Sequence, residues 1–100
     1  MDSATLRSIL AKTDGSKPGI ENAAGAMMRL YDTSPGVAVS EWRNTLQTCQ
    51  PQQLLPLLYV ANEVLQNSKR NRGTKFLEAF SPVLGPSLIV MVQRDPSLIV

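Results

Sequence analysis

The residues of this chain best suited to chemistry are amides and charged groups between Tyr59 and Arg70, in the run YVANEVLQNSKR. At the 100° helical step, one arc of a helix carries Asn62, Gln66, Tyr59, Arg70, Glu63 and Asn67, in that angular order. Asparagine is a poor helix former because its amide competes for nearby main-chain groups. Amides donate and accept hydrogen bonds at once, which suits the unpaired main chain of an extended peptide. The arc therefore predicts a peptide-binding helix face, and a solvated helix face is the plainer alternative.

A basic cluster follows directly, in the stretch KRNRGTK from Lys69 to Lys75. Arginine offers a planar fork to phosphate, so the cluster is one candidate for an anion site. Cations are also favoured near a helix C-terminus by the helix dipole, which is the structural alternative.

Composition excludes several classes of function. The chain has no histidine and one cysteine, Cys49, so we expect no zinc site, no other metal and no disulfide framework. The chain has neither a histidine that could act as a base nor a nucleophile motif. We therefore expect no enzyme activity, no cofactor and no small-molecule substrate. The net charge of +2 does not indicate a general nucleic-acid binder. No continuous apolar run reaches the roughly 18–20 residues of a membrane span, so we expect no membrane contact.

Helix signals divide the chain. Ser3 and Ser16 are expected caps of a first and a second helix, with Pro18 in the first turn of the second. A third helix should begin at Ser34–Gly36, and a fourth should run from about Gln52 to Arg70. Gly73 suits the position after its end.

The apolar residues that follow recur at helical spacing, and no stretch alternates for long as a surface strand. A fifth helix is expected from Phe76, kinked or restarted at Ser81–Pro82 within SPVLGPS. We expect Val37, Val39, Trp42 and Leu46 to anchor the third helix in the core. The sequence therefore predicts one all-α domain whose antiparallel helices are joined by short connections.

The run from Tyr59 to Arg70 closely resembles the central helix of the CTD-interacting domain (CID) family, usually Tyr-Leu-Ala-Asn-Asp-Val-Ile-Gln-Asn-Ser-(Lys/Arg). FLEAFSPVLGPSL, from Phe76 to Leu88, resembles the family's following helix, and Trp42 and Ser16 also have counterparts. The resemblance covers about residues 3–95 and implies a right-handed superhelical bundle of antiparallel helices, with about five to six of them present.

The resemblance implies a function in transcription termination or mRNA 3′-end processing, in the nucleus. Family members bind the heptad-repeat tail (Tyr-Ser-Pro-Thr-Ser-Pro-Ser) of the largest RNA polymerase II subunit, often when serines are phosphorylated. By position, Asn62 would hydrogen-bond the peptide main chain and Glu63 would accept from the peptide tyrosine hydroxyl. Asn67 and Arg70 would continue the groove, and Tyr59 would pack at its base.

The chain departs from the family pattern in three places. Glu63 replaces an aspartate, and the loop DGSKPG keeps only Ser16 of the family's polar residues. The chain ends in Leu98-Ile99-Val100, so we expect residues 1–100 to form a CID that lacks its last helices.

Two other kinds of partner fit parts of the sequence. Adaptor modules of the VHS and ENTH type share a similar superhelical fold and bind sorting peptides or lipid headgroups; they are the alternative function. RNA contact through the basic cluster is expected as an accessory role, with steep salt dependence.

Overall fold

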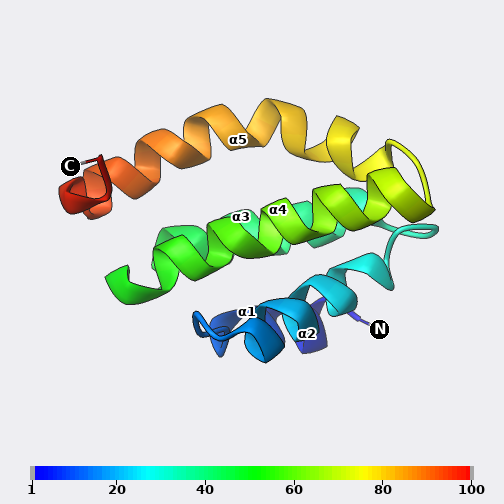
Figure 1. Ribbon diagram of the computed structural model, residues 1–100, viewed down its shortest axis with the longest axis horizontal. Coiled ribbons are helices and arrows are strands. Elements are labelled where there is room, and N and C mark those ends of the chain that lie inside the picture. Colours follow the sequence, from blue (N-terminus) through cyan, green and yellow to red (C-terminus); the bar gives the residue numbers. More distant parts are fainter. Residues whose placement is uncertain (1, 100) are drawn as a thin grey trace.

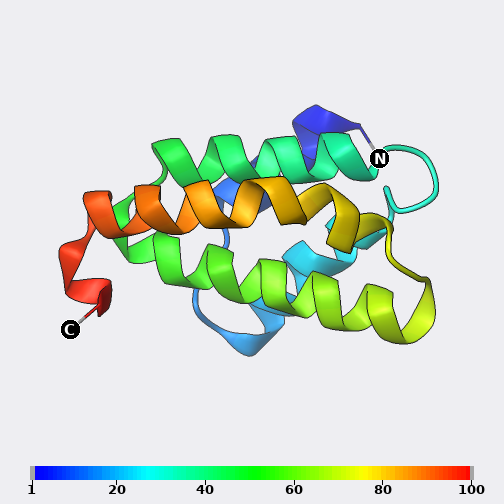
Figure 2. The same cartoon turned by 90° about the horizontal axis from the view of Figure 1, so that it is seen from above.

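The computed structural model describes residues 2–99. They form helices α1 (Ser3–Ala11), α2 (Lys17–Met28), α3 (Pro35–Thr48), α4 (Leu54–Asn71) and α5 (Lys75–Arg94), with 3-10 turns η1 (Pro51–Gln53) and η2 (Pro96–Ile99). The α1 and α2 helices lie below, α3 and α4 form the middle, and α5 lies on top (Figure 1). Seen from above, α5 runs between α3 and α4 (Figure 2). The predicted all-α bundle is confirmed, and no strand occurs among the described residues.

Helix starts follow capping chemistry, with one correction. The Ser16 hydroxyl accepts from the Gly19 amide at 3.1 Å and Pro18 lies in the first turn of α2, as predicted. The first helix is capped by Asp2 rather than Ser3: a carboxylate oxygen of Asp2 accepts from the Thr5 amide at 2.8 Å. Sequence alone could not separate these neighbours, because both side chains are good caps.

The core fills the space between the three layers, which are α1 with α2, α3 with α4, and α5. Trp42 is fully buried, donates from Nε1 to the Leu57 carbonyl at 2.7 Å, and meets the Phe80 ring edge-on at 5.2 Å between centroids. Val39 and Leu46 are buried as predicted, but Val37 is 45% exposed and does not anchor α3. The other buried apolar side chains come from every helix, including Leu6, Leu10, Ala23, Met27, Leu54, Val60, Val64, Phe76 and Met91.

Helix α5 is continuous, so of the two alternatives expected at Ser81–Pro82, a kink or a restart, the restart is wrong. Pro82 and Pro86 are exposed and lie one turn apart, and the helix arches over the bundle (Figure 1). Each proline removes one main-chain hydrogen bond on the solvent side. The Ser81 hydroxyl donates to the Leu77 carbonyl at 2.6 Å, a bond that also favours bending. The two prolines therefore bend the helix around the core without ending it.

By length and composition alone, α5 would suffice to cross a membrane, although the sequence has no continuous apolar run of that length. Its inner face carries Phe76, Phe80, Ser87 and Met91, all buried, and it packs on α3. Its outer face stays open, and only 22% of its most apolar window is buried.

Two arginines tie distant elements together. The Arg7 guanidinium of α1 donates to both carboxylate oxygens of Glu41 in α3, at 2.7 and 3.0 Å. This bidentate bond lowers the pKa of Glu41 below its ordinary value of 4.5. Arg94 at the end of α5 donates to the Leu46 carbonyl at 2.8 Å and to the Cys49 carbonyl, so it caps the end of α3.

The α4–α5 corner depends on Gly73, whose φ of +136° favours glycine. Its amide donates to the Ser68 carbonyl at 2.6 Å, which confirms the predicted helix end. Val100, part of the apolar end that suggested missing helices, lies outside the described residues, and that suggestion stays a prediction.

Candidate peptide-binding groove

Helix α4 turns its polar arc outward, as the sequence predicts. Tyr59, Asn62 and Arg70 are exposed, and Glu63 and Asn67 are half-buried. The opposite arc is buried in the core and comprises Leu54, Leu57, Val60, Ala61 and Val64. The leucines and valines hold the helix in the bundle, so its amides and its carboxylate are left to face solvent.

A cavity of about 340 Å³ opens between α4 and the N-terminal end of α2. Tyr59, Asn62 and Glu63 line it from α4. The facing wall comes from the α1–α2 loop and α2, and consists of Gly15, Lys17, Ile20 and Glu21. The structure thus brings three of the five predicted site residues to one cavity, with Asn67 and Arg70 further along the same helix.

Tyr59 lies at the wall of this cavity rather than at a closed base. It is 47% exposed, whereas we expected it to pack under the groove. Its ring is therefore accessible to a ligand that enters between α2 and α4.

The polar groups of the arc are hydrogen-bonded only along their own helix. Gln66 Nε2 donates to Asn62 Oδ1 at 3.4 Å, and Asn67 Nδ2 donates to Glu63 Oε1 at 3.3 Å. Such pairs at i,i+4 contribute about 0.2–0.5 kcal/mol each. Within residues 2–99, no hydrogen bond joins these four side chains to another helix. A ligand can therefore replace them at small cost.

The facing wall brings charge that the sequence analysis did not foresee. Lys17 and Glu21 approach within 4.0 Å on α2, and both are largely exposed, so the pair contributes little to stability. Two hydrogen bonds from Ser16 to the Asp14 carboxylate, one from the hydroxyl and one from the amide, lower the pKa of Asp14 and fix the loop beside the cavity. The packing of α2 against α4 decides which residues of the α1–α2 loop face α4. No sequence motif indicates this packing.

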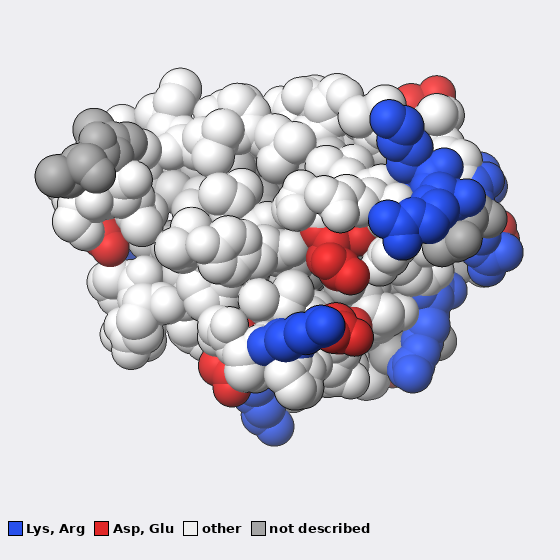
Figure 3. Space-filling view, in the orientation of Figure 1, with Lys and Arg blue, Asp and Glu red and all other residues white. Residues whose placement is uncertain are grey.

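Charges are distributed unevenly along the groove. Acidic side chains lie near the centre of the face in Figure 3, and Lys and Arg gather at the end where α4 meets α5. At that end Arg72 pairs with Asp32 at 3.2 Å, and Arg72 and Lys75 lie 5.6 and 5.2 Å from the centroid of the Tyr31 ring. The basic cluster is thus partly a structural feature that fixes the corner.

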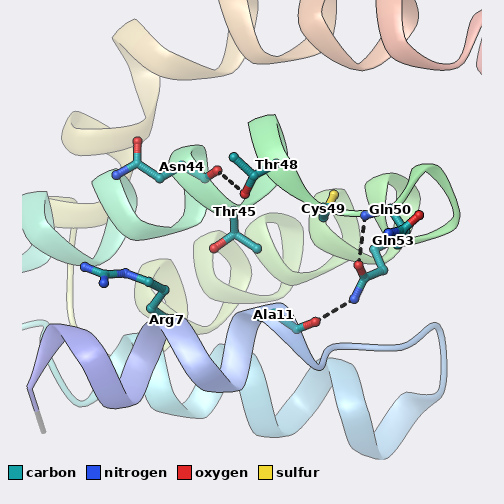
Figure 4. Close-up of a pocket in the computed structure, with 8 residues that line it drawn as sticks. All are labelled: Arg7, Ala11, Asn44, Thr45, Thr48, Cys49, Gln50 and Gln53. Carbon is teal, nitrogen blue, oxygen red and sulfur yellow. Dashed lines mark hydrogen bonds between the residues drawn. The ribbon is translucent and has the colours of Figure 1, made fainter.

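A cavity of about 510 Å³ lies elsewhere, between α1, α3 and the α3–α4 turn (Figure 4). Several of its polar groups are already hydrogen-bonded within the chain. The side-chain amide of Gln53 donates to the Ala11 carbonyl and accepts from the main-chain amide of Gln50. The Thr48 hydroxyl donates to the Asn44 carbonyl. None of the predicted site residues lines it. In the described part of the chain, no group of three or more His, Cys, Asp or Glu side chains could hold a metal ion.

Comparison with known proteins decides the family. The CID domain matches residues 4–98, almost the whole chain. The chain belongs to the CID family. The helix with the outward amides, α4, lies inside the matched region, and so do both walls of the cavity.

Curated relatives match a shorter stretch. "Regulation of nuclear pre-mRNA domain-containing protein 1A" of chicken is 46% identical over 46 residues, which is 46% of this chain and 17% of that protein. The human protein of that name is 44% identical over 46 residues, 46% of this chain and 14% of the relative. Human "Regulation of nuclear pre-mRNA domain-containing protein 1B" is 43% identical over 49 residues, 49% of this chain and 15% of the relative. The matched stretch is therefore less than a fifth of each of these relatives.

Proposed function

We propose that this chain is a non-catalytic module that binds the heptad-repeat tail of the largest RNA polymerase II subunit. The observation that carries the proposal is the open cavity beside α4, lined by an amide and a carboxylate that are hydrogen-bonded only along their own helix. The process it serves is transcription termination or mRNA 3′-end processing, in the nucleus. Membership of the CID family and the nuclear pre-mRNA names of the relatives support this assignment over a VHS- or ENTH-type adaptor.

The roles of the site residues are those that the family resemblance implies, and the chemistry of the side chains suits them. Asn62 hydrogen-bonds the peptide main chain, and Glu63 accepts from the peptide tyrosine hydroxyl at the cavity between α2 and α4. Tyr59 forms an accessible side wall for that tyrosine. Asn67 and Arg70 continue the contact toward the α4–α5 corner.

The energetics require several contacts together. A neutral hydrogen bond contributes about 0.5–1.5 kcal/mol net. Micromolar affinity needs about 8 kcal/mol. An extended tail with few apolar anchors therefore has to use the whole length of α4, and no single side chain accounts for binding.

The basic end of the groove offers no exposed aromatic ring to RNA among the described residues. Stacking on exposed aromatic rings is how proteins hold single-stranded bases, and Tyr31 at the basic end is only 5% exposed. The expected accessory RNA contact has no further support in the described residues.

Fluorescence anisotropy with a labelled two-heptad peptide tests the proposal. We expect saturable binding by the chain, and none to a scrambled peptide of the same composition. Glu63→Ala should weaken binding with unchanged helicity by circular dichroism. Gln47→Ala on the exposed face of α3 is the matched control and should bind normally. A folded chain that shows no saturable binding would refute the proposed function.

A further inference from the structure

The outer side of helix α5 is apolar and uncharged over most of its length. No charged residue lies between Glu78 and Arg94. Leu77, Leu88 and Ile89 on this helix are 53%, 44% and 60% exposed. Figure 3 shows an uncharged surface along the top of the molecule, where α5 lies, up to the charged α4–α5 corner. Continuous exposed apolar surface marks an interaction site.

One stripe of this surface runs along the whole helix, beside its buried face. At the helical step of 100° per residue, its members share an arc of about 100°. We call them the α5 stripe: Leu77, Ser81, Leu84, Gly85, Leu88 and Val92. All six residues are half-buried or exposed, so the stripe reaches solvent from one end of α5 to the other.

Large and small residues alternate along the stripe in a self-complementary order. The midpoint of α5 lies between Leu84 and Gly85. A twofold axis at that point sets two copies of the helix antiparallel, and residues equally far from the midpoint then lie opposite each other. The opposed pairs are Leu84 with the partner's Gly85, Leu88 with the partner's Ser81, and Leu77 with the partner's Val92. Two leucines of each copy or its partner thus meet a glycine or a serine, which is the large-against-small order that close packing needs.

The two small residues of the stripe suit an interface better than they suit the isolated helix. Glycine lowers helix stability relative to alanine, yet a Cβ added at Gly85 would meet nothing within 4 Å beyond its chain neighbours and the helix backbone. Its missing side chain therefore leaves room only on the open side of α5. The Ser81 hydroxyl already donates to the Leu77 carbonyl at 2.6 Å, so an apolar group can cover it without leaving a donor unpaired.

We propose that the α5 stripe is the interface of a homodimer, in which two copies of the chain pack antiparallel about a twofold axis at Leu84–Gly85. An uncharged stripe brings no like charges together when it meets itself. Antiparallel packing also sets the N-terminus of each helix beside the C-terminus of the other, which the helix dipoles favour.

The size of the stripe predicts a weak, reversible dimer. Twenty residues of helix are about 30 Å long and about 10 Å wide, so two copies cover roughly 600 Å² together. Stable interfaces exceed about 1,000 Å², and smaller ones belong to transient complexes. We therefore expect self-association only at high concentrations of the chain.

Sedimentation equilibrium of the whole chain, over roughly 10 µM to 1 mM, tests the proposal. The apparent mass should rise with concentration from that of the monomer toward twice that value. Leu88→Glu places a carboxylate in an opposed pair and should raise the dimer Kd about 10-fold or more. Val37→Glu is the matched control, because Val37 is 45% exposed, like Leu88 at 44%, but lies on α3. It should leave the Kd unchanged, and circular dichroism checks that both variants fold.

A second stripe variant separates association from folding. Glutamine is a better helix former than glycine, and the monomer has room for a side chain at position 85, so Gly85→Gln should raise the urea midpoint. The same side chain takes the space of the partner's Leu84, so the dimer Kd should rise about 10-fold. A defect of folding would lower the urea midpoint instead.

The remaining outcomes overturn the proposal. A chain that stays monomeric over the whole concentration range has no such interface, and a dimer whose Kd is unchanged in both stripe variants associates through another surface. A monomer that floats with phosphatidylcholine vesicles, and no longer floats as Leu88→Glu, would assign the stripe to a membrane. A longer form of the chain that is monomeric under the same conditions would show that its further residues cover the stripe. None of these results bears on the heptad-peptide titration, which tests the proposed function by itself.

Discussion

Replacing Asn62 by alanine should weaken peptide binding without lowering the stability of the fold. In the middle of an exposed helix, alanine is favoured over asparagine by about 0.5 kcal/mol. The substitution loses the 3.4 Å bond from Gln66, which is worth about 0.2–0.5 kcal/mol. The free energy of unfolding should therefore stay the same or rise by up to about 0.3 kcal/mol.

Binding should respond much more strongly to the same change. The Asn62 amide can make one or two hydrogen bonds to a peptide main chain, each worth about 0.5–1.5 kcal/mol. A loss of about 1–2 kcal/mol raises the Kd roughly 5- to 30-fold. Urea unfolding gives the stability and anisotropy with the unmodified two-heptad peptide gives the Kd, on the same samples.

Asn44→Ala, on the exposed side of α3, is the matched control for this prediction. It carries the same gain in helix propensity and lies away from the groove, so its Kd should not change. An Asn62→Ala variant that keeps the parent's Kd would show that the α4 amide does not hold the peptide. An unfolding free energy lowered by more than about 1 kcal/mol would show that Asn62 is instead a structural residue.

Three further predictions concern the scaffold. Arg7→Met should destabilise the fold at pH 7. The Arg7 hydrogen bonds lower the folded-state pKa of Glu41, so the stabilisation exists above the ordinary value of 4.5 and is lost as pH falls through the folded value. The difference between the urea midpoints of parent and variant should therefore shrink as the pH is lowered below 4.5. A gap that stays constant from pH 7 to pH 3 would contradict this. Gly73→Ala should cost about 1–3 kcal/mol or more, because φ is +136° and an added Cβ would lie 2.7 Å from the Tyr31 hydroxyl; an unchanged melting temperature would refute it. Trp42→Phe should cost about 2 kcal/mol through the lost 2.7 Å bond to α4 and a small cavity, and guanidinium unfolding with no change in midpoint would show the bond to be dispensable.

The sequence was sufficient to predict α4 and its two faces. Its apolar residues recur at the helical period, and the asparagines mark the face that packing does not use. Helix caps were predictable where one good residue stands alone, as at Ser16, and not where two compete, as at Asp2 and Ser3. Val37 was misjudged because the first turn of α3 lies at the edge of the bundle, where apolar side chains often stay exposed.

What sequence reasoning could not provide was the second wall of the groove and the long-range polar links. Lys17 and Glu21 face α4 only because α2 packs against it, and this geometry arises from contacts between residues far apart in the chain. The continuity of α5 was also unpredictable from local rules, since Pro82 interrupts helices in most contexts. Here burial of Phe76 and Phe80 on one side outweighs the bonds lost on the other.

The fork of Arg94 on the end of α3 has a consequence for how this chain is made. The last turn of α3 is completed by a guanidinium that comes 48 positions after Leu46 in the chain. A chain that has left the ribosome only as far as α4 lacks that group, so the carbonyls at the end of α3 stay with water until synthesis of α5 is finished. The last turn of α3 is therefore completed only when α5 has been made, and proteolysis of stalled nascent chains should find this turn open.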